Sequence, residues 1–317
     1  MSKTNNVSDY IKKKKRGQWI RKASFLAMLC LLLFGVLYLA EQFPGSELNA
    51  LITGNSQGNE EKFPLTIKNE QLIDAVELNG RLALLSKSNL LCYNVKGKRQ
   101  SNSMHGYTNP VMKSNGKRVL IYDRAGNKLK VAASNSIIGE LTLENSILCA
   151  AIASDGSIAV ATIQDQYASY QIRVYDDLLN ERYKFSPANE GATTVDFSSL
   201  AFSKDGSKLA ACSITTKDGM LAASVYELDL NQDSAPIITL IPNLLPLDIS
   251  WKQNGNLMLI GSDALVSLDH KTQQQVRYSY VGSLQGIVAD LHQNTILVTR
   301  DLTENRSTIT VIDAYDK

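Results

Sequence analysis

Tight-turn dipeptides recur along this 317-residue chain and constrain its fold more than any other feature. Asparagine–glycine and aspartate–glycine pairs accept the positive backbone angles of two-residue hairpin turns. A short apolar run precedes each pair, and a strand-like run such as RVLIYD or KLAACSI follows it. The sequence therefore predicts one β-hairpin in each repeat. The pairs start at spacings of 36, 40, 50 and 49 residues, at Asn79, Asn115, Asp155, Asp205 and Asn254, followed by a degenerate sixth turn, Gln293-Asn294.

Each repeat also has room for two further strands. A third strand-like run follows every hairpin, as in KLKVAAS, and a weaker fourth, such as IIGELTL, follows in most repeats. Four antiparallel strands every 40–50 residues are typical of a β-propeller blade. We therefore predict an all-β fold in which residues 62–317 form a six-bladed β-propeller. The sixth repeat stops after its third strand, so we expect residues 62–69 (KFPLTIKN) to add the fourth strand and close the ring.

The N-terminal region has a different composition. Residues 23–40 contain no charge, and with the apolar residues beside them they approach the roughly 20 residues that a transmembrane helix needs. A cleavable signal peptide is the alternative. Its apolar region is usually about 7–15 residues long, and its cleavage site needs a small residue where this chain has Tyr38. We predict an uncleaved transmembrane helix at residues 23–42.

The charge distribution orients this helix. Residues 1–22 carry a net charge of +7, whereas the rest of the chain carries −5. Because positive residues stay on the cytoplasmic side, we predict a cytoplasmic tail (1–22), a linker (43–61) and an extracytoplasmic domain at the cell membrane. The mildly acidic body argues against a nucleic-acid partner. The topology signal consists of Lys12, Lys13, Lys14, Lys15, Arg16, Arg21 and Lys22.

The predicted propeller offers little catalytic chemistry. Its three histidines lack the spacing of metal ligands. Cys92, Cys149 and Cys212 lie in apolar runs, where a cysteine behaves as a small buried hydrophobe. The G-x-S-x-G match at residues 54–58 lacks the strand before it and the helix after it that a nucleophile elbow needs. We therefore expect no catalytic, metal-binding or cofactor-binding residue.

One pattern suggests a binding surface. In an up-and-down blade, the connection between the second and third strands lies on the opposite side of the ring from the other two connections. Five of these six second connections hold an aspartate. The simpler interpretation is that aspartate caps the turns through its own backbone. The alternative is a rim of carboxylates that attracts a cation or a basic partner. The residues are Asp123, Asp165, Asp218, Asp263 and Asp301.

The stretch NPVMKSNGKRVLIYDRAGNKL (109–129), with the apolar anchor and the SDGS and SKDGSKLAACS turns, resembles a family of membrane-anchored bacterial proteins, domain of unknown function 5711. A weaker similarity links the turns to WD40-type propellers. The family resemblance implies a Gram-positive, often clostridial, host and supplies no activity. We predict a non-enzymatic binding or scaffold module for an envelope protein or polymer. The alternative is an envelope hydrolase or lyase with its site in the channel, to which Arg118, Arg173 and Lys252 could contribute.

Overall fold

The computed structural model describes residues 67, 70–133, 136–164, 169–187, 196–232, 234–289, 294–301 and 303–313. The chain divides into two units, Met1–Glu60 and Glu61–Lys317, and all described residues belong to the second. No helix among them is long and apolar enough to cross a membrane. The predicted tail, transmembrane helix and linker (residues 1–61) lie outside the described residues, so these boundaries stay predictions.

The described residues of the second unit form 23 strands in six antiparallel sheets, each with its strands in chain order. Blade by blade, the strands are β1 (Leu72–Leu78), β2 (Arg81–Ser86), β3 (Asn89–Tyr93) and β4 (Arg99–Met104); β5 (Pro110–Ser114), β6 (Val119–Asp123), β7 (Lys128–Ala133) and β8 (Ser136–Thr142); β9 (Ser146–Ile152), β10 (Ile158–Gln164), β11 (Ser169–Tyr175) and β12 (Glu181–Phe185); β13 (Asp196–Phe202), β14 (Lys208–Lys217), β15 (Met220–Asp229) and β16 (Ile237–Pro242); β17 (Pro246–Trp251), β18 (Leu257–Gly261), β19 (Ala264–Leu268) and β20 (Gln275–Ser279); β21 (Ser283–Ala289), β22 (Thr295–Asp301) and β23 (Arg306–Ile312).

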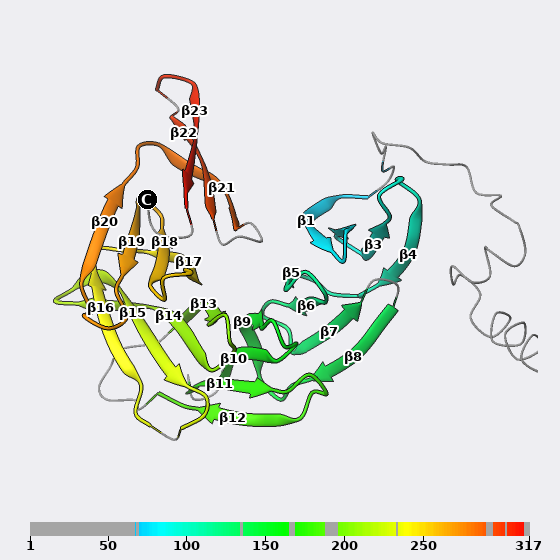
Figure 1. The fold of residues 1–317 in the computed structure, drawn as a ribbon, viewed down its shortest axis with the longest axis horizontal. Helices are drawn as coiled ribbons and strands as arrows, with labels where there is room; N and C mark the ends of the chain where they lie inside the picture. The colour runs from blue at the N-terminus through cyan, green and yellow to red at the C-terminus, as the bar shows by residue number, and fades with distance from the viewer. Residues whose placement is uncertain are drawn as a thin grey trace, which may run out of the picture. The chain divides into compact units, whose positions relative to one another are not determined.

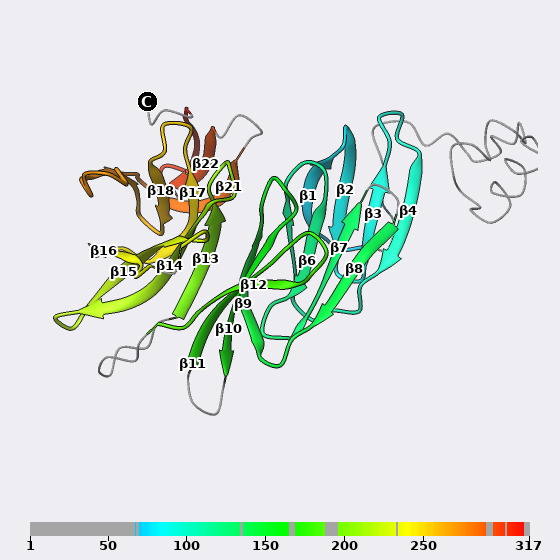
Figure 2. The same cartoon turned by 60° about the horizontal axis from the view of Figure 1, so that its bottom comes forward.

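The sheets are arranged as the blades of a propeller. Figure 1 shows the first strands, such as β5, β9, β13 and β17, on the inside and the fourth strands, such as β8 and β16, on the outside. In the turned view of Figure 2, the first two blades lie face to face, and β1 contacts β5 while β4 contacts β8. The predicted six-bladed, all-β propeller is therefore confirmed. The sixth blade has three described strands, and the strand expected to complete it (62–69) lies outside the described residues except for Ile67.

In the first five blades, the first connection is the tight turn that the sequence predicts, whereas residue 293 of the sixth predicted turn lies outside the described residues. Asn79 and Gly80 join β1 to β2 with φ angles of 52° and 71°, a conformation that asparagine and glycine adopt readily. The other four complete dipeptides join β5 to β6, β9 to β10, β13 to β14 and β17 to β18. Some of these turns also bond to the next blade. For example, Asn115 Nδ2 donates to the carbonyl of Ala153 at 2.7 Å. Local turn chemistry thus also joins neighbouring blades.

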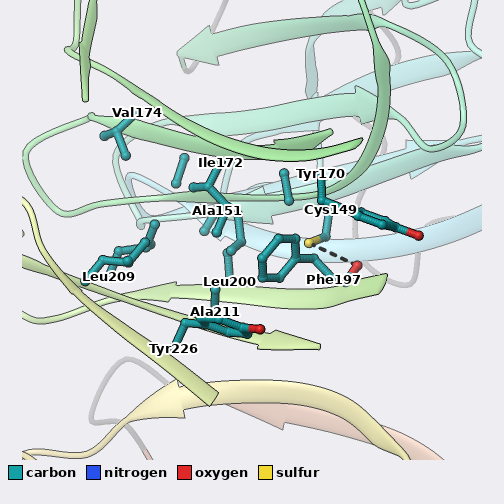
Figure 3. Packing of buried hydrophobic residues seen from close by; sticks show 13 residues of the cluster. Cys149, Ala151, Tyr170, Ile172, Val174, Phe197, Leu200, Leu209, Ala211 and Tyr226 are labelled. Atoms are coloured by element: carbon teal, nitrogen blue, oxygen red, sulfur yellow. Dashed lines mark hydrogen bonds between the residues drawn. The ribbon is translucent and has the colours of Figure 1, made fainter. Parts of the chain in front are cut away.

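The hydrophobic core lies between the blades. Between the third and fourth blades, Cys149 and Ile172 pack with Phe197 and Tyr226 (Figure 3). The Phe197 and Tyr226 rings meet edge to face, with their centroids 5.7 Å apart. All three cysteines of the propeller are free and buried, as the apolar runs around them predict. Burial of apolar surface at each blade interface is the main stabilising contribution in such a ring.

Five of the six inner strands share a feature that the sequence did not predict. The register of β1, β9, β13, β17 and β21 shifts by one residue near the start of the strand, whereas β5 pairs without interruption. Such a β-bulge leaves one residue unpaired and turns its side chain away from the regular alternation. The unpaired residues are Ile73, Leu148, Ser198, Leu247 and Gln285.

Candidate functional site

One side of the ring carries the second connections of the blades together with the chain passages that lead from one blade to the next. Hydrogen bonds hold the two sets together: the backbone N–H of Arg124 donates to the carbonyl of Asn109, and that of His105 donates to the carbonyl of Ser88. We call this side, which includes residues 87–88, 105–109, 124–127, 218–219 and 262–263, the second-connection face.

The structure places four of the five predicted rim aspartates at second connections. Asp123 and Asp301 end β6 and β22, Asp218 lies between β14 and β15, and Asp263 lies between β18 and β19. Asp165 lies outside the described residues. The four described aspartates therefore lie at or beside second connections, whereas the rim as a binding face for a cation or a basic partner stays a prediction.

Three of the four described rim carboxylates have partners within the propeller. Asp123 Oδ1 accepts the backbone N–H groups of Thr108 and Asn109, at 3.1 and 2.8 Å. Asp301 Oδ1 accepts the Thr303 hydroxyl at 2.6 Å, and this bond is the main reason that the pKa of Asp301 is lowered. Asp263 Oδ2 lies 3.4 Å from a guanidinium nitrogen of Arg277. Of these contacts, only those of Asp301 are the turn cap of the simpler interpretation. Asp123 bonds to the passage between the first and second blades, and Asp263 pairs with a residue of β20.

Charged and polar side chains of three blades meet between the inner strands. Lys113 Nζ on β5 lies 3.7 Å from Asp248 Oδ2 on β17, and the Ser199 hydroxyl on β13 donates to Asp248 Oδ1 at 2.5 Å. Asp248 raises the pKa of Lys113. The lysine therefore stays protonated, and it is a poor nucleophile or general base. This group, which we call the channel cluster (Lys113, Ser199 and Asp248), links the second, fourth and fifth blades.

The residues named for the enzymatic alternative are bound to separate partners. Arg118 Nη2 lies 3.5 Å from Asp177 Oδ2. Arg173 lies 3.4 Å from Glu181. Lys252 is buried, and its ammonium group donates to the Thr295 hydroxyl at 2.7 Å. Each contact joins structural elements at a different point of the ring. No shared site is built from these three cations by the contacts described.

The two described histidines have structural partners. His105 is buried, its Nδ1 accepts the Tyr107 N–H, and its Nε2 lies 3.0 Å from the Ser86 carbonyl, which fixes a neutral ring that donates from Nε2. His270 Nδ1 lies 3.4 Å from Glu227 Oε2. Within the described ranges, no group of three or more His, Cys, Asp or Glu residues is placed to hold a metal ion.

The thiols of the propeller are in an environment that opposes their ionisation. Burial raises the pKa of Cys149 to about 12, and the Cys149 thiol donates to the Phe197 carbonyl at 3.7 Å (Figure 3). Burial also raises the pKa of Cys212. Because the thiolate is the nucleophilic form, these two cysteines have a structural environment and not a reactive one.

A hollow of about 410 Å³ opens on the second-connection face between the first and second blades. Ile73, the bulge residue of β1, is 49% exposed and forms part of its wall. Local sequence signals could not reveal this hollow, because its walls come from the turns and strand ends of two blades. The lining residues are Gln71, Ile73, Lys87, Thr108, Asn109, Pro110, Val111 and Arg124.

Strand ends on the same face carry exposed apolar side chains. Exposed apolar groups that lie close together commonly mark an interaction surface. The exposed apolar residues at strand ends of the second-connection face are Leu72, Ile73, Met104, Met220, Leu221 and Leu247.

A second hollow, of about 470 Å³, lies elsewhere, between β20 and β23, and has Tyr278, Thr308 and Val311 in its walls.

These features define the class of the protein: a six-bladed, all-β propeller with a polar channel cluster and an accessible second-connection face. The chain belongs to the family of unknown function DUF5711, whose model matches residues 59–315. Among curated proteins, none matches this sequence.

Solved structures with the same fold share little sequence with this chain. The WD40 domain of Pan2 from Neurospora crassa is 11% identical, with a TM-score of 0.53 over 75% of this chain and 74% of that one. A structure of the mitotic checkpoint complex is 12% identical, with a TM-score of 0.56 over 77% of this chain and 75% of that one. The structure of a streptogramin B lyase is 12% identical, with a TM-score of 0.53 over 78% of this chain and 85% of that one. At such low identity, these similarities show the propeller fold alone.

Proposed function

We propose that this chain is a non-enzymatic binding module, held on the outer side of the cell membrane by its N-terminal anchor. In this proposal, the second-connection face docks an envelope protein or polymer. The anchor, the orientation and the partner are inferred from the sequence: an uncharged run of 18 residues (23–40) follows a strongly basic tail.

One observation carries the proposal: the charged groups of the channel bind one another, whereas the second-connection face keeps an open hollow. Lys113 and Asp248 form an ion pair between blades, and Ser199 is hydrogen-bonded to the same carboxylate. A hydroxyl nucleophile needs both a hydrogen bond to a base and access for a substrate, and Ser199, although it donates to Asp248, is only 4% exposed. The hollow and the exposed apolar strand ends instead suit a docked surface.

The proposal is tested by crosslinking in the native membrane. The photoreactive residue p-benzoylphenylalanine replaces Thr108, which lines the hollow, or Val95, which is exposed on the connection between β3 and β4. Both versions are irradiated in cells, and the crosslinked products are purified and identified. A binding module that uses the second-connection face gives a defined product from position 108 and none from position 95.

Three results would contradict the proposal. Absence of any product from both positions would argue against a stable partner. Equal products from both positions would argue against a preferred face. Turnover of an envelope substrate by the purified full-length chain, lost when Lys113 or Asp248 is replaced, would favour the hydrolase or lyase alternative.

A further inference from the structure

The hollow on the second-connection face is lined by two cationic residues, neither of which has an anionic partner among the residues that the structure describes. Lys87 lies in the turn between β2 and β3, and Arg124 lies in the turn between β6 and β7. Both side chains are exposed, and neither forms an ion pair with any residue that the structure describes. Two like charges that face one hollow raise its positive potential and favour an incoming anion.

The acidic residues nearest in the chain form hydrogen bonds with neutral groups. Asp123 uses Oδ1 to hold the backbone N–H groups of Thr108 and Asn109, so it shapes the wall of the hollow. Glu70 Oε1 accepts Asn89 Nδ2 at 2.8 Å. The backbone N–H of Lys87 donates to the carbonyl of Gln71 at 2.9 Å, which fixes the other wall. The cations therefore lie on a frame that hydrogen bonds hold in place.

The rest of the lining narrows the chemistry of the ligand. Ile73, Pro110 and Val111 offer apolar surface, and the side chains of Gln71 and Asn109 offer amide groups. Amide groups donate to and accept from a peptide backbone. A lysine and an arginine bind a carboxylate through charge-assisted hydrogen bonds.

We propose that this hollow docks a short segment of a partner protein that contains an acidic residue beside an apolar one. The carboxylate lies between Lys87 and Arg124, and the apolar side chain packs against Ile73 and Val111. This inference rests on the proposed binding function and specifies the chemistry of its partner. It also reverses the charge that the aspartate rim suggested for the partner.

A protein segment fits this face better than a polyanionic wall polymer. Asp218, Asp263 and Asp301 lie at second connections on other blades of the same ring. A polymer with a charge on every unit would meet these carboxylates and be repelled. A peptide with a single carboxylate places its charge in the hollow alone.

The inference is tested by selection from a random peptide library displayed on phage, with the full-length chain in detergent micelles as the target. The test variant is Lys87→Gln combined with Arg124→Gln. The matched control is Lys217→Gln combined with Arg300→Gln, which removes two exposed cations near the second connections of the fourth and sixth blades. Circular dichroism and thermal unfolding of both variants verify that the fold is intact.

Selected peptides are then synthesised, and their affinities are measured by fluorescence polarisation. We expect enrichment of peptides with Asp or Glu beside Leu, Ile or Val. Replacing the acidic residue of the peptide by its amide, or using the test variant, weakens binding by about tenfold or more, whereas the control variant stays within about twofold. Polyphosphate at matched charge competes poorly.

Three outcomes would overturn the inference. Enriched peptides that lack an acidic residue, or that bind the test variant as tightly as the wild type, would contradict docking at this hollow. The proposed binding function would not be affected. Polyphosphate that competes more strongly than the peptides would assign the cations to a polyanion. Absence of any enriched peptide would contradict peptide docking. The membrane crosslinking experiment would then test separately whether the chain binds a partner.

Discussion

Replacing Phe197 by alanine tests whether the blades are held together by the cores between them. Phe197 on β13 is 2% exposed and packs between the third and fourth blades (Figure 3). A phenylalanine buries roughly 150–250 Å², which at about 25 cal/mol per Å² corresponds to about 4–6 kcal/mol. Its edge-to-face contacts with Tyr170 and Tyr226, at 6.5 and 5.7 Å between centroids, add to this value.

Measured core truncations of phenylalanine cost about 3–5 kcal/mol, so we expect Phe197→Ala to lower the free energy of unfolding by about 4 kcal/mol. The assay is urea unfolding of the full-length chain, followed by circular dichroism. The control is Leu178→Ala, because Leu178 is 76% exposed in the turn after β11 and its loss should change stability by less than about 0.5 kcal/mol. A loss below about 1 kcal/mol for Phe197→Ala, or equal losses for both variants, would refute this account of the blade interface.

Three further predictions concern thiols, a carboxylate and a turn. Burial raises the pKa of Cys149 to about 12, and all three thiols of the propeller are buried. Peptide mapping after iodoacetamide treatment at neutral pH should therefore find Cys92, Cys149 and Cys212 unmodified in the folded chain and modified in denaturant. Labelling of the native thiols would contradict their burial. Desolvation raises the pKa of Asp196. Because this residue is exposed, the penalty on its ionised form is small, and stability falls slightly as pH rises through that raised pKa. Asp196→Asn should therefore raise the melting temperature near neutral pH and leave it unchanged below about pH 3.5; a stabilising effect that persists in acid would refute the reasoning. Gly156→Ala should cost more stability than Gly80→Ala, by up to about 1 kcal/mol, because a Cβ at Gly156 would displace the Arg118 guanidinium from Asp177 and would lie 3.3 Å from Asp177 Cβ, whereas the space at Gly80 is open. Equal melting temperatures would count against this geometry.

The sequence predicts those parts of the fold that short-range chemistry determines. A turn such as Asn79-Gly80 adopts its conformation because of its own two residues, so the first connections, their spacing and the number of blades follow from the chain. Burial of Cys149 and Cys212 follows from the apolar runs around them in the same way. The four described rim aspartates lie at second connections for a similar reason, because the strand pattern around each one locates the connection.

The remaining features depend on contacts between distant parts of the chain. Lys113 and Asp248 belong to blades that are not consecutive, and no local pattern relates them. The bulges depend on the register between neighbouring strands, which periodicity does not reveal. The hollow combines Lys87 and Arg124 from turns of different blades, so its charge becomes visible only when the blades are packed.

The central claim is that a partner docks on the second-connection face of an anchored propeller. Hydrogen–deuterium exchange tests it most directly when the full-length chain in its native membrane is compared with the purified chain in micelles. The account predicts added protection in residues 105–109 and 123–127 and little change in residues 94–98 and 176–180, which belong to third connections on the other side of the ring. Protection of the third connections, or no difference between the two samples, would contradict the claim.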